Sequence, residues 1–145
     1  MSERTPRLTR GDFRAFRAIT TRWMDNDAYG HLNNVVYYSL FDTAVNAWLV
    51  ERGLLEVVAS PVVGLVVETG CTYFESVAFP EPLEAGMAVE RLGRSSVRYR
   101  VAIFRDGADR AAAQGHFVHV YVERATGTPA AIPERTRSAL ETIAL

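Results

Sequence analysis

Residues 33–52 carry the clearest pattern of apolar and polar positions in the chain. Apolar residues recur three and four positions apart, the spacing that places them on one face of an α-helix. Asn33 or Asn34 can cap the start of this helix, and Gly53 follows its end. The apolar face is wide, which predicts a helix covered on most sides by a sheet. Its members are Val35, Val36, Tyr37, Tyr38, Leu40, Phe41, Ala44, Val45, Ala47, Trp48 and Leu49.

Most of the remaining chain has the composition of β-strands, with many Val, Thr, Tyr and Phe residues. The alternation is cleanest in residues 95–105, where apolar side chains occupy the odd positions from Val97 to Ile103. Polar Arg98 and Arg100 lie between them. The expected strands cover residues 13–23, 61–74, 87–93, 95–105 and 110–123, and a short helix follows from Pro133.

This order of elements predicts an α+β fold with an antiparallel sheet. A length of 145 residues suits one core, so we expect residues 1–145 to form a single domain. Residues 1–12 are polar and charged, and we expect a flexible N-terminal segment there. The pattern by itself leaves other α+β topologies open.

The composition limits the partners and the compartment. The formal net charge is −1, so nothing indicates a general attraction to nucleic acid or to an acidic membrane. Every basic residue is Arg, so a side-chain cation that binds phosphate must be Arg. Cys71 is the sole cysteine, which excludes an intrachain disulfide. The chain has no signal-peptide pattern and no membrane-spanning apolar stretch, so we expect a cytoplasmic protein.

The segment Arg22–Asn34 places two carboxylates, a glycine and a histidine directly before the long helix. A helix N-terminus presents free backbone N–H groups and a partial positive charge. A carboxylate beside these donors can attack a carbonyl that they polarise, or activate water to attack it. The segment therefore predicts half of an acyl-transfer site. The alternative is that Asp27 only caps a turn or the helix.

A metal site is not expected. Residues 25–36 superficially resemble a calcium loop, but the fifth and twelfth positions are Tyr29 and Val36, which do not supply the required ligands. The three histidines of the chain show no zinc-ligand spacing. We therefore expect no metal and no cofactor.

Residues 25–34 (DNDAYGHLNN), followed by Tyr37 and Tyr38, resemble the signature of hotdog-fold acyl-CoA thioesterases of the 4-hydroxybenzoyl-CoA thioesterase type. Residues 68–75 (ETGCTYFE) and 91–96 (RLGRSS) also resemble that family. The resemblance implies the hotdog fold, in which a five-stranded antiparallel sheet wraps around a long central helix. It also implies dimers whose sheets join edge to edge, often paired into tetramers. Active sites lie between subunits in that family, so we expect a homodimer or homotetramer.

The resemblance also implies roles for residues of the loop. Asp27 stands at the position of the nucleophile or general base, and the backbone N–H of Asn34 at that of the oxyanion donor. We favour a structural role for Asp25, which would hold the loop. Gly30 permits a positive φ angle. His31 could orient Asp27, donate a hydrogen bond to the thioester oxygen, or only brace the loop.

Further residues are candidates for substrate binding. The basic stretch 91–100 could hold CoA phosphates, with a solvated strand face as the alternative. Tyrosines near the loop could bound the acyl group, together with Phe74 and Trp48. Glu68 could line the acyl pocket of the partner subunit. The candidates are Tyr29, Tyr37, Glu68, Arg91, Arg94, Ser96 and Arg98.

We therefore expect an acyl-CoA thioesterase, whose substrate is the CoA thioester and whose products are the free acid and CoA. Two alternatives stay open. One is a hotdog enoyl-CoA hydratase or dehydratase, which would act on the 2,3-carbons without releasing thiol. The other is a module that binds acyl-CoA without cleaving it.

Overall fold

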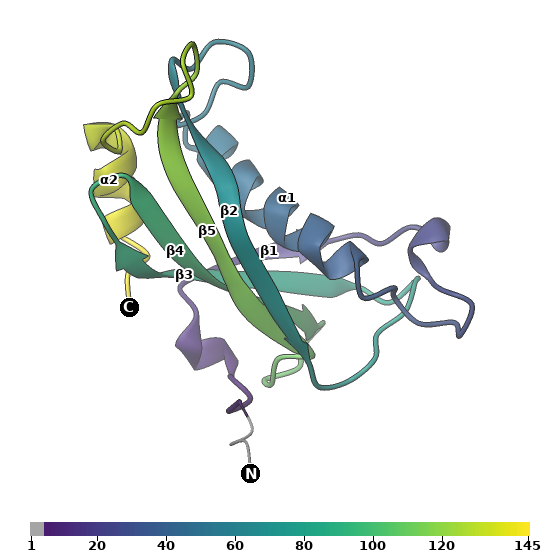
Figure 1. Ribbon diagram of the computed structural model, residues 1–145. Helices are drawn as coiled ribbons and strands as arrows, with labels where there is room; N and C mark the ends of the chain where they lie inside the picture. Colours follow the sequence, from purple (N-terminus) through teal and green to yellow (C-terminus); the bar gives the residue numbers. More distant parts are fainter. Residues whose placement is uncertain (1–4) are drawn as a thin grey trace.

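The structure is a computed structural model that describes residues 5–145. Within them, five antiparallel strands form one sheet in the order β1-β3-β4-β5-β2, and a long helix lies across one face (Figure 1). The strands are β1 (Ala15–Ile19), β2 (Val62–Tyr73), β3 (Leu83–Leu92), β4 (Ser96–Arg105) and β5 (Ala113–Glu123). The helices are α1 (Val36–Glu51) and α2 (Glu134–Glu141). The arrangement is α+β and is the hotdog fold that the resemblance implies.

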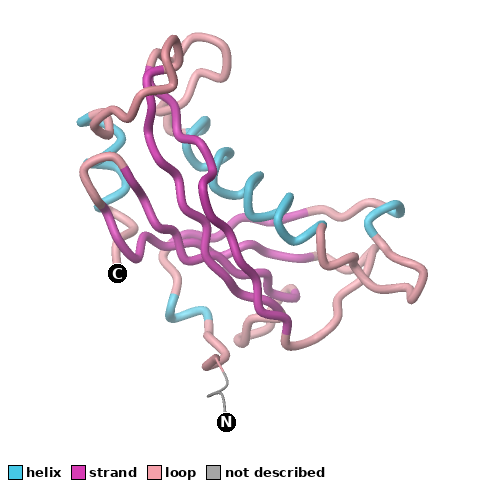
Figure 2. Tube along the Cα trace, in the orientation of Figure 1, coloured by secondary structure: helices cyan, strands magenta, loops and turns pink. Residues whose placement is uncertain are grey.

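The main core lies between α1 and the face of the sheet that curls around this helix (Figure 2). Phe41 and Val45 of α1 are fully buried in one cluster with Tyr99 and Phe117 of the sheet. The opposite side of the helix, which includes Asp42, is exposed. We expected a helix that is covered on most sides, but within this chain only the side that faces the sheet is buried.

The boundaries of two strands, β1 and β3, differ by four residues at one end from those that the sequence predicts, and β5 begins three residues later than expected. The strand expected over residues 13–23 is shorter, because β1 ends at Ile19 and Trp23 begins a 3₁₀ turn. The Trp23 side chain is 79% exposed. β3 begins at Leu83 rather than at residue 87. The apolar residues of 13–23 thus do not share one strand, since Phe13 packs on the other face of the sheet.

The N-terminal segment covers part of the outer face of the sheet. Of the segment 1–12, which we expected to be flexible, residues 1–4 lie outside the described residues. The Leu8 N–H donates to Gln114 Oε1 (2.8 Å), and Gln114 Nε2 donates to the Pro6 carbonyl (2.7 Å). Phe13 packs edge-on against Phe104, with 5.5 Å between ring centroids. Phe104 occupies an even position of β4 and faces away from α1, so the segment removes this ring from water.

Strand β2 forms one edge of the sheet. It pairs with β5, and no other described strand pairs with it. Leu65, Val66 and Val67 near its middle are 50%, 46% and 60% exposed. Unpaired backbone groups beside exposed apolar side chains favour pairing with another chain. Strand β2 is therefore an edge with exposed apolar side chains near its middle.

His119 of β5 is buried in the core, where its ring meets the rings of Tyr99, Phe117 and Tyr121. Burial lowers the pKa of His119 to about 4. The ordinary pKa of an unfolded histidine is about 6.5. Between these values the unfolded chain binds a proton that the folded protein does not. The free energy of unfolding therefore falls as the pH decreases through this window.

We expect the titration of His119 to make the free energy of unfolding about 2 kcal/mol lower at pH 5 than at pH 7. His119→Gln removes this titration, so the variant should lose that part of the pH dependence, whatever its stability at pH 7. Urea denaturation of both proteins at both pH values, at constant ionic strength, measures the two differences. A variant that keeps the full pH dependence would show that another group causes it.

Candidate active site

The loop that precedes α1 is anchored by the buried Asp25. Its carboxylate accepts hydrogen bonds from the backbone N–H of Arg22 (2.8 Å) and from the Arg22 guanidinium (2.9 and 3.1 Å). Burial works against ionisation of Asp25, but these hydrogen bonds and the positive charge outweigh it, so the pKa of Asp25 lies below its ordinary value. The Asp25 carbonyl also accepts the Asn33 N–H (2.9 Å). Asp25 thus has the structural role that we favoured for it.

The loop then makes a tight turn from Asp27 to His31. The Asp27 N–H donates to the His31 carbonyl (2.8 Å), and the Gly30 N–H donates to the Asp27 carbonyl (3.1 Å). Gly30 has a φ of +77°, in the left-handed region that other residues adopt at a cost. The Leu32 N–H donates to the Val77 carbonyl (2.8 Å) and ties the turn to the segment between β2 and β3. These bonds fix where the Asp27 side chain begins.

The Asp27 carboxylate uses one oxygen for this turn and leaves the other available. Oδ1 accepts the Tyr29 N–H (2.8 Å) and, at 3.4 Å, the His31 N–H. Oδ2 receives no hydrogen bond from residues 5–145. Asp27 therefore does cap a turn, as the alternative interpretation supposed, and it still has an oxygen that can reach a substrate. His31 contacts this carboxylate through its backbone, not through its exposed ring.

The start of α1 leaves one backbone donor free beside this carboxylate. Asn33 Oδ1 accepts the Val35 N–H (3.0 Å), and the Asn33 carbonyl accepts the Val36 N–H (2.9 Å). Asn33 therefore closes the turn that leads into α1, whereas the N-cap position is Val35 and no side chain caps it, so neither Asn33 nor Asn34 is the cap that we expected. The Asn34 N–H has no acceptor among the described residues. A free N–H at a helix N-terminus can stabilise negative charge.

The Asp27 side chain and Asn34 line one open pocket of about 390 Å³, within the range of roughly 300–1,000 Å³ usual for small-molecule sites. Six of our candidate residues meet in it: Asp27, Tyr29, His31, Asn34, Tyr37 and Phe74. The other lining residues are Leu32, Tyr73, Glu75 and Ser76. Of these, Tyr73, Glu75 and Ser76 were missed from the sequence. Tyr73 ends β2 and the other two follow it, and no local spacing indicates that this strand end lies beside the start of α1.

The arginine candidates lie at the other end of the sheet. On β4, Ser96 begins the strand, whereas Ile103 is level with Ala113 and, through it, with Tyr73 of the pocket. With a rise of about 3.4 Å per strand residue, the two levels are roughly 24 Å apart. One chain therefore does not bring residues 91–98 to the Asp27 pocket.

Two candidates for substrate binding, Arg98 and Glu68, form an ion pair with each other on the outer face of the sheet. Arg98 forms ion pairs with Glu68 (3.2 Å) and Glu90 (3.1 Å). Glu68 also lies 3.7 Å from His116. Arg91, near the end of β3, and Arg94, in the turn between β3 and β4, are in contrast exposed. Within this chain, Arg94 is consequently more available to a phosphate than Arg98.

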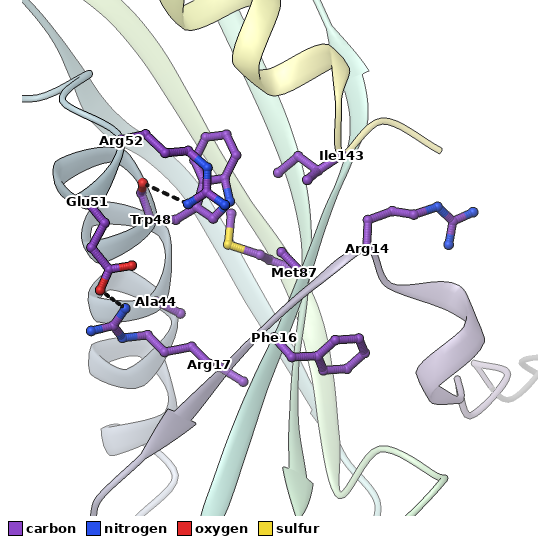
Figure 3. A pocket seen from close by; sticks show the side chains of 11 residues that line it. Arg14, Phe16, Arg17, Ala44, Trp48, Glu51, Arg52, Met87 and Ile143 are labelled. Atoms are coloured by element: carbon purple, nitrogen blue, oxygen red, sulfur yellow. Dashed lines mark hydrogen bonds and ion pairs between the residues drawn. The ribbon is translucent and has the colours of Figure 1, made fainter.

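A second pocket, of about 250 Å³, lies between the last turns of α1 and the strands β1 and β3 (Figure 3). Trp48 and Met87 line it, and Arg52 stacks on the Trp48 ring at 4.1 Å. Arg17 forms an ion pair with Glu51 at its rim. We expected Trp48 to help bound the acyl group, but it lines this pocket and not the one that contains Asp27.

Within residues 5–145, no group of three or more His, Cys, Asp and Glu side chains could hold a metal ion. Over the same residues, no helix combines the length and the apolar character needed to cross a membrane.

A model of the thioesterase-like superfamily matches residues 21–140. Among solved structures, the PA5185 protein from Pseudomonas aeruginosa strain PAO1 is 52% identical, with a TM-score of 0.94 over 96% of this chain and 97% of that one. The PA2801 protein from Pseudomonas aeruginosa, described as a candidate thioesterase, is 25% identical, with a TM-score of 0.78 over 92% and 98%. Slr0204, a 1,4-dihydroxy-2-naphthoyl-CoA thioesterase from Synechocystis, is 13% identical and shares the fold, with a TM-score of 0.78 over 86% and 93%. No curated protein matches significantly.

Proposed function

Because the chain belongs to the thioesterase-like superfamily, we propose that it hydrolyses acyl-CoA thioesters to the free acid and CoA, with Asp27 as nucleophile or general base. Membership of the superfamily supports thioester hydrolysis as the general activity. One observation carries the finer proposal. Asp27, with an unpaired carboxylate oxygen, and the free N–H of Asn34 line the same pocket.

The Asn34 N–H and the Asp27 carboxylate have different roles in the proposed hydrolysis. The thioester oxygen accepts the Asn34 N–H, which stabilises the negative charge that develops when the carbonyl is attacked; such a donor is typically worth about 3–4 kcal/mol. Asp27 Oδ2 either takes a proton from the water that attacks the carbonyl carbon, and the C–S bond then breaks, or attacks this carbon itself. In the second route the C–S bond breaks to leave a mixed anhydride between Asp27 and the acyl group, and water then cleaves the anhydride to the acid and the free Asp27 carboxylate. In both routes water supplies OH to the acid or the carboxylate and H to the thiol. A thiol has a pKa of about 8.5, so its thiolate leaves without a strong general acid.

The geometry also supports a site completed by a second copy of the chain. The Asp27 pocket lies at the Tyr73 end of β2, and the turn with Arg94 lies towards the other end. If β2 pairs antiparallel with β2 of a partner, opposite ends of the two strands come together. The partner's Arg94 would then approach the Asp27 pocket, where it could hold CoA phosphates. The exposed tyrosine at position 29, with 85% of its surface in water, would be covered by the partner.

We expect Asp27→Asn to lower thiol release from acyl-CoA by roughly 10²–10⁴-fold, because the amide is neither a base nor a nucleophile. Release is measured with a thiol reagent on a panel of short, long and aromatic acyl-CoAs. Asp42→Asn, on the exposed side of α1, is the control and should keep wild-type turnover. Full turnover in Asp27→Asn would refute the assignment of Asp27. If wild type bound CoA thioesters but cleaved none, the protein would be a binding module.

We expect Gly30→Ala to lose about tenfold in turnover, because the left-handed conformation that holds the Asp27 turn is strained by a Cβ. The matched control is Gly107→Ala, in the turn between β4 and β5. Both glycines have a φ above +70° and open space around the added Cβ, so both variants should lose about 1–2 kcal/mol of stability. Thermal unfolding and thiol release on both variants separate the two effects. Equal turnover in the two variants would mean that the Gly30 turn does not position Asp27.

We expect two inactive variants to complement each other if the site is shared. Asp27→Asn and the double variant Arg91→Ala/Arg94→Ala are assayed alone and after refolding together at low acyl-CoA concentration. Half of all the dimers formed on mixing are heterodimers, and each heterodimer carries one intact site out of two, which restores about a quarter of wild-type activity. Activity equal to the mean of the two separate variants would place Asp27 and the arginines in different sites.

A further inference from the structure

Tyr73, the last residue of β2, contacts the start of α1 at two points. Its hydroxyl donates a hydrogen bond of 2.7 Å to the Asn34 carbonyl, across 39 residues of sequence. Its ring meets the Tyr37 ring edge-on, with 4.9 Å between centroids. Tyr37 belongs to the first turns of α1 and is 3% exposed, so it provides a fixed surface for Tyr73. The strand end is thereby joined to Asn34, which lines the pocket and whose N–H has no acceptor among the described residues.

We propose that Tyr73 is a positioning residue, which holds the Asn34–Val35 peptide by its carbonyl, limits the φ and ψ angles of Asn34, and so keeps the Asn34 N–H of the preceding peptide pointed at the substrate carbonyl. The inference rests on the proposed thioesterase function and adds to it a residue that the loop motif does not contain. Tyr73 itself acts through Asn34 and need not touch the thioester.

The need for such a residue follows from how the turn before α1 is held. Asn34 is exposed, and it belongs neither to the helix nor to the hydrogen-bonded Asp27 turn. On its N-terminal side the Asn33 N–H is bonded to Asp25, and on its C-terminal side the Val35 N–H is bonded to the Asn33 side chain. The Asn34 residue between them makes one described hydrogen bond, the one from Tyr73. The Asn34 N–H itself belongs to the preceding peptide, whose Asn33 carbonyl accepts the Val36 N–H. Without the Tyr73 bond, the Asn34–Val35 peptide keeps only the bond from the Val35 N–H to the Asn33 side chain, so the φ and ψ angles of Asn34 are less restricted.

The orientation of this N–H matters because an oxyanion donor stabilises the transition state only within a narrow range of distances from the oxyanion. The donor must lie about 2.7–3.1 Å from the position that the oxyanion occupies in the transition state. A displacement of about 1 Å can cost a hundredfold in rate. A Tyr73 hydroxyl that limits the rotation of Asn34 therefore acts on the transition state, with little effect on how the substrate first binds.

Tyr73→Phe tests the proposal, because it removes the hydroxyl and keeps the ring against Tyr37. We expect kcat to fall about tenfold with KM changed less than about twofold, since only the oxyanion donor is displaced. In ¹⁵N NMR spectra the Asn34 amide should shift and exchange faster with solvent. Tyr99→Phe is the matched control. It removes a buried hydroxyl that has no partner and lies outside the pocket, so kcat and the Asn34 amide should not change.

The results separate failure of this inference from failure of the function. If wild type releases thiol, Asp27→Asn does not, and Tyr73→Phe keeps the wild-type kcat, Tyr73 is only a structural tie and the inference is wrong. An Asn34 amide that is unchanged in Tyr73→Phe, or an equal loss of kcat in Tyr99→Phe, would also overturn it. If wild type cleaves no thioester, the proposed function fails, and the inference fails with it.

Discussion

The packing of the apolar face of α1 against the curled face of the sheet is the interaction on which the rest of the structure depends. Phe41 and Val45 are fully removed from water there, and burial of a side chain of this kind contributes roughly 1.5–3 kcal/mol. Because the helix lies across the sheet, its N-terminus is placed beside the end of β2 (Figure 1). A free backbone donor, a carboxylate loop and an aromatic strand end thereby meet in one pocket.

The candidate site is built mostly from backbone hydrogen bonds, with few contacts between side chains. The Asp25 carboxylate accepts hydrogen bonds that hold the loop, and the Asp27 carboxylate uses one oxygen to accept hydrogen bonds within its turn. This division explains how two carboxylates close in sequence can differ in role. It also leaves the pocket open on one side, next to an edge strand that has exposed apolar residues. An open pocket beside an unpaired edge is consistent with a site that a second subunit completes.

The outer face of the sheet, which does not contact α1, is covered partly by the N-terminal segment and partly by charged side chains. At one end, Phe13 and the chain before it cover Phe104. Towards the other end, Arg98 neutralises Glu68 and Glu90 in water-exposed ion pairs, which are worth little individually. The paired Arg98 is a poor phosphate ligand within this chain, while the exposed Arg94 at the turn is free of such partners among the described residues.

The sequence by itself determined what depends on short-range spacing. The helical period of residues 36–51 and the alternation in β4 were both predicted, since each is set by neighbours a few positions away. Only the tertiary structure decided which distant groups meet. Tyr73 reaches Asn34, the N-terminal segment covers Phe104, Trp48 lines a different pocket, and Arg94 lies far from Asp27 in the same chain. Each of these depends on how the sheet curls and pairs, and a local pattern carries no information about strand partners or sheet edges.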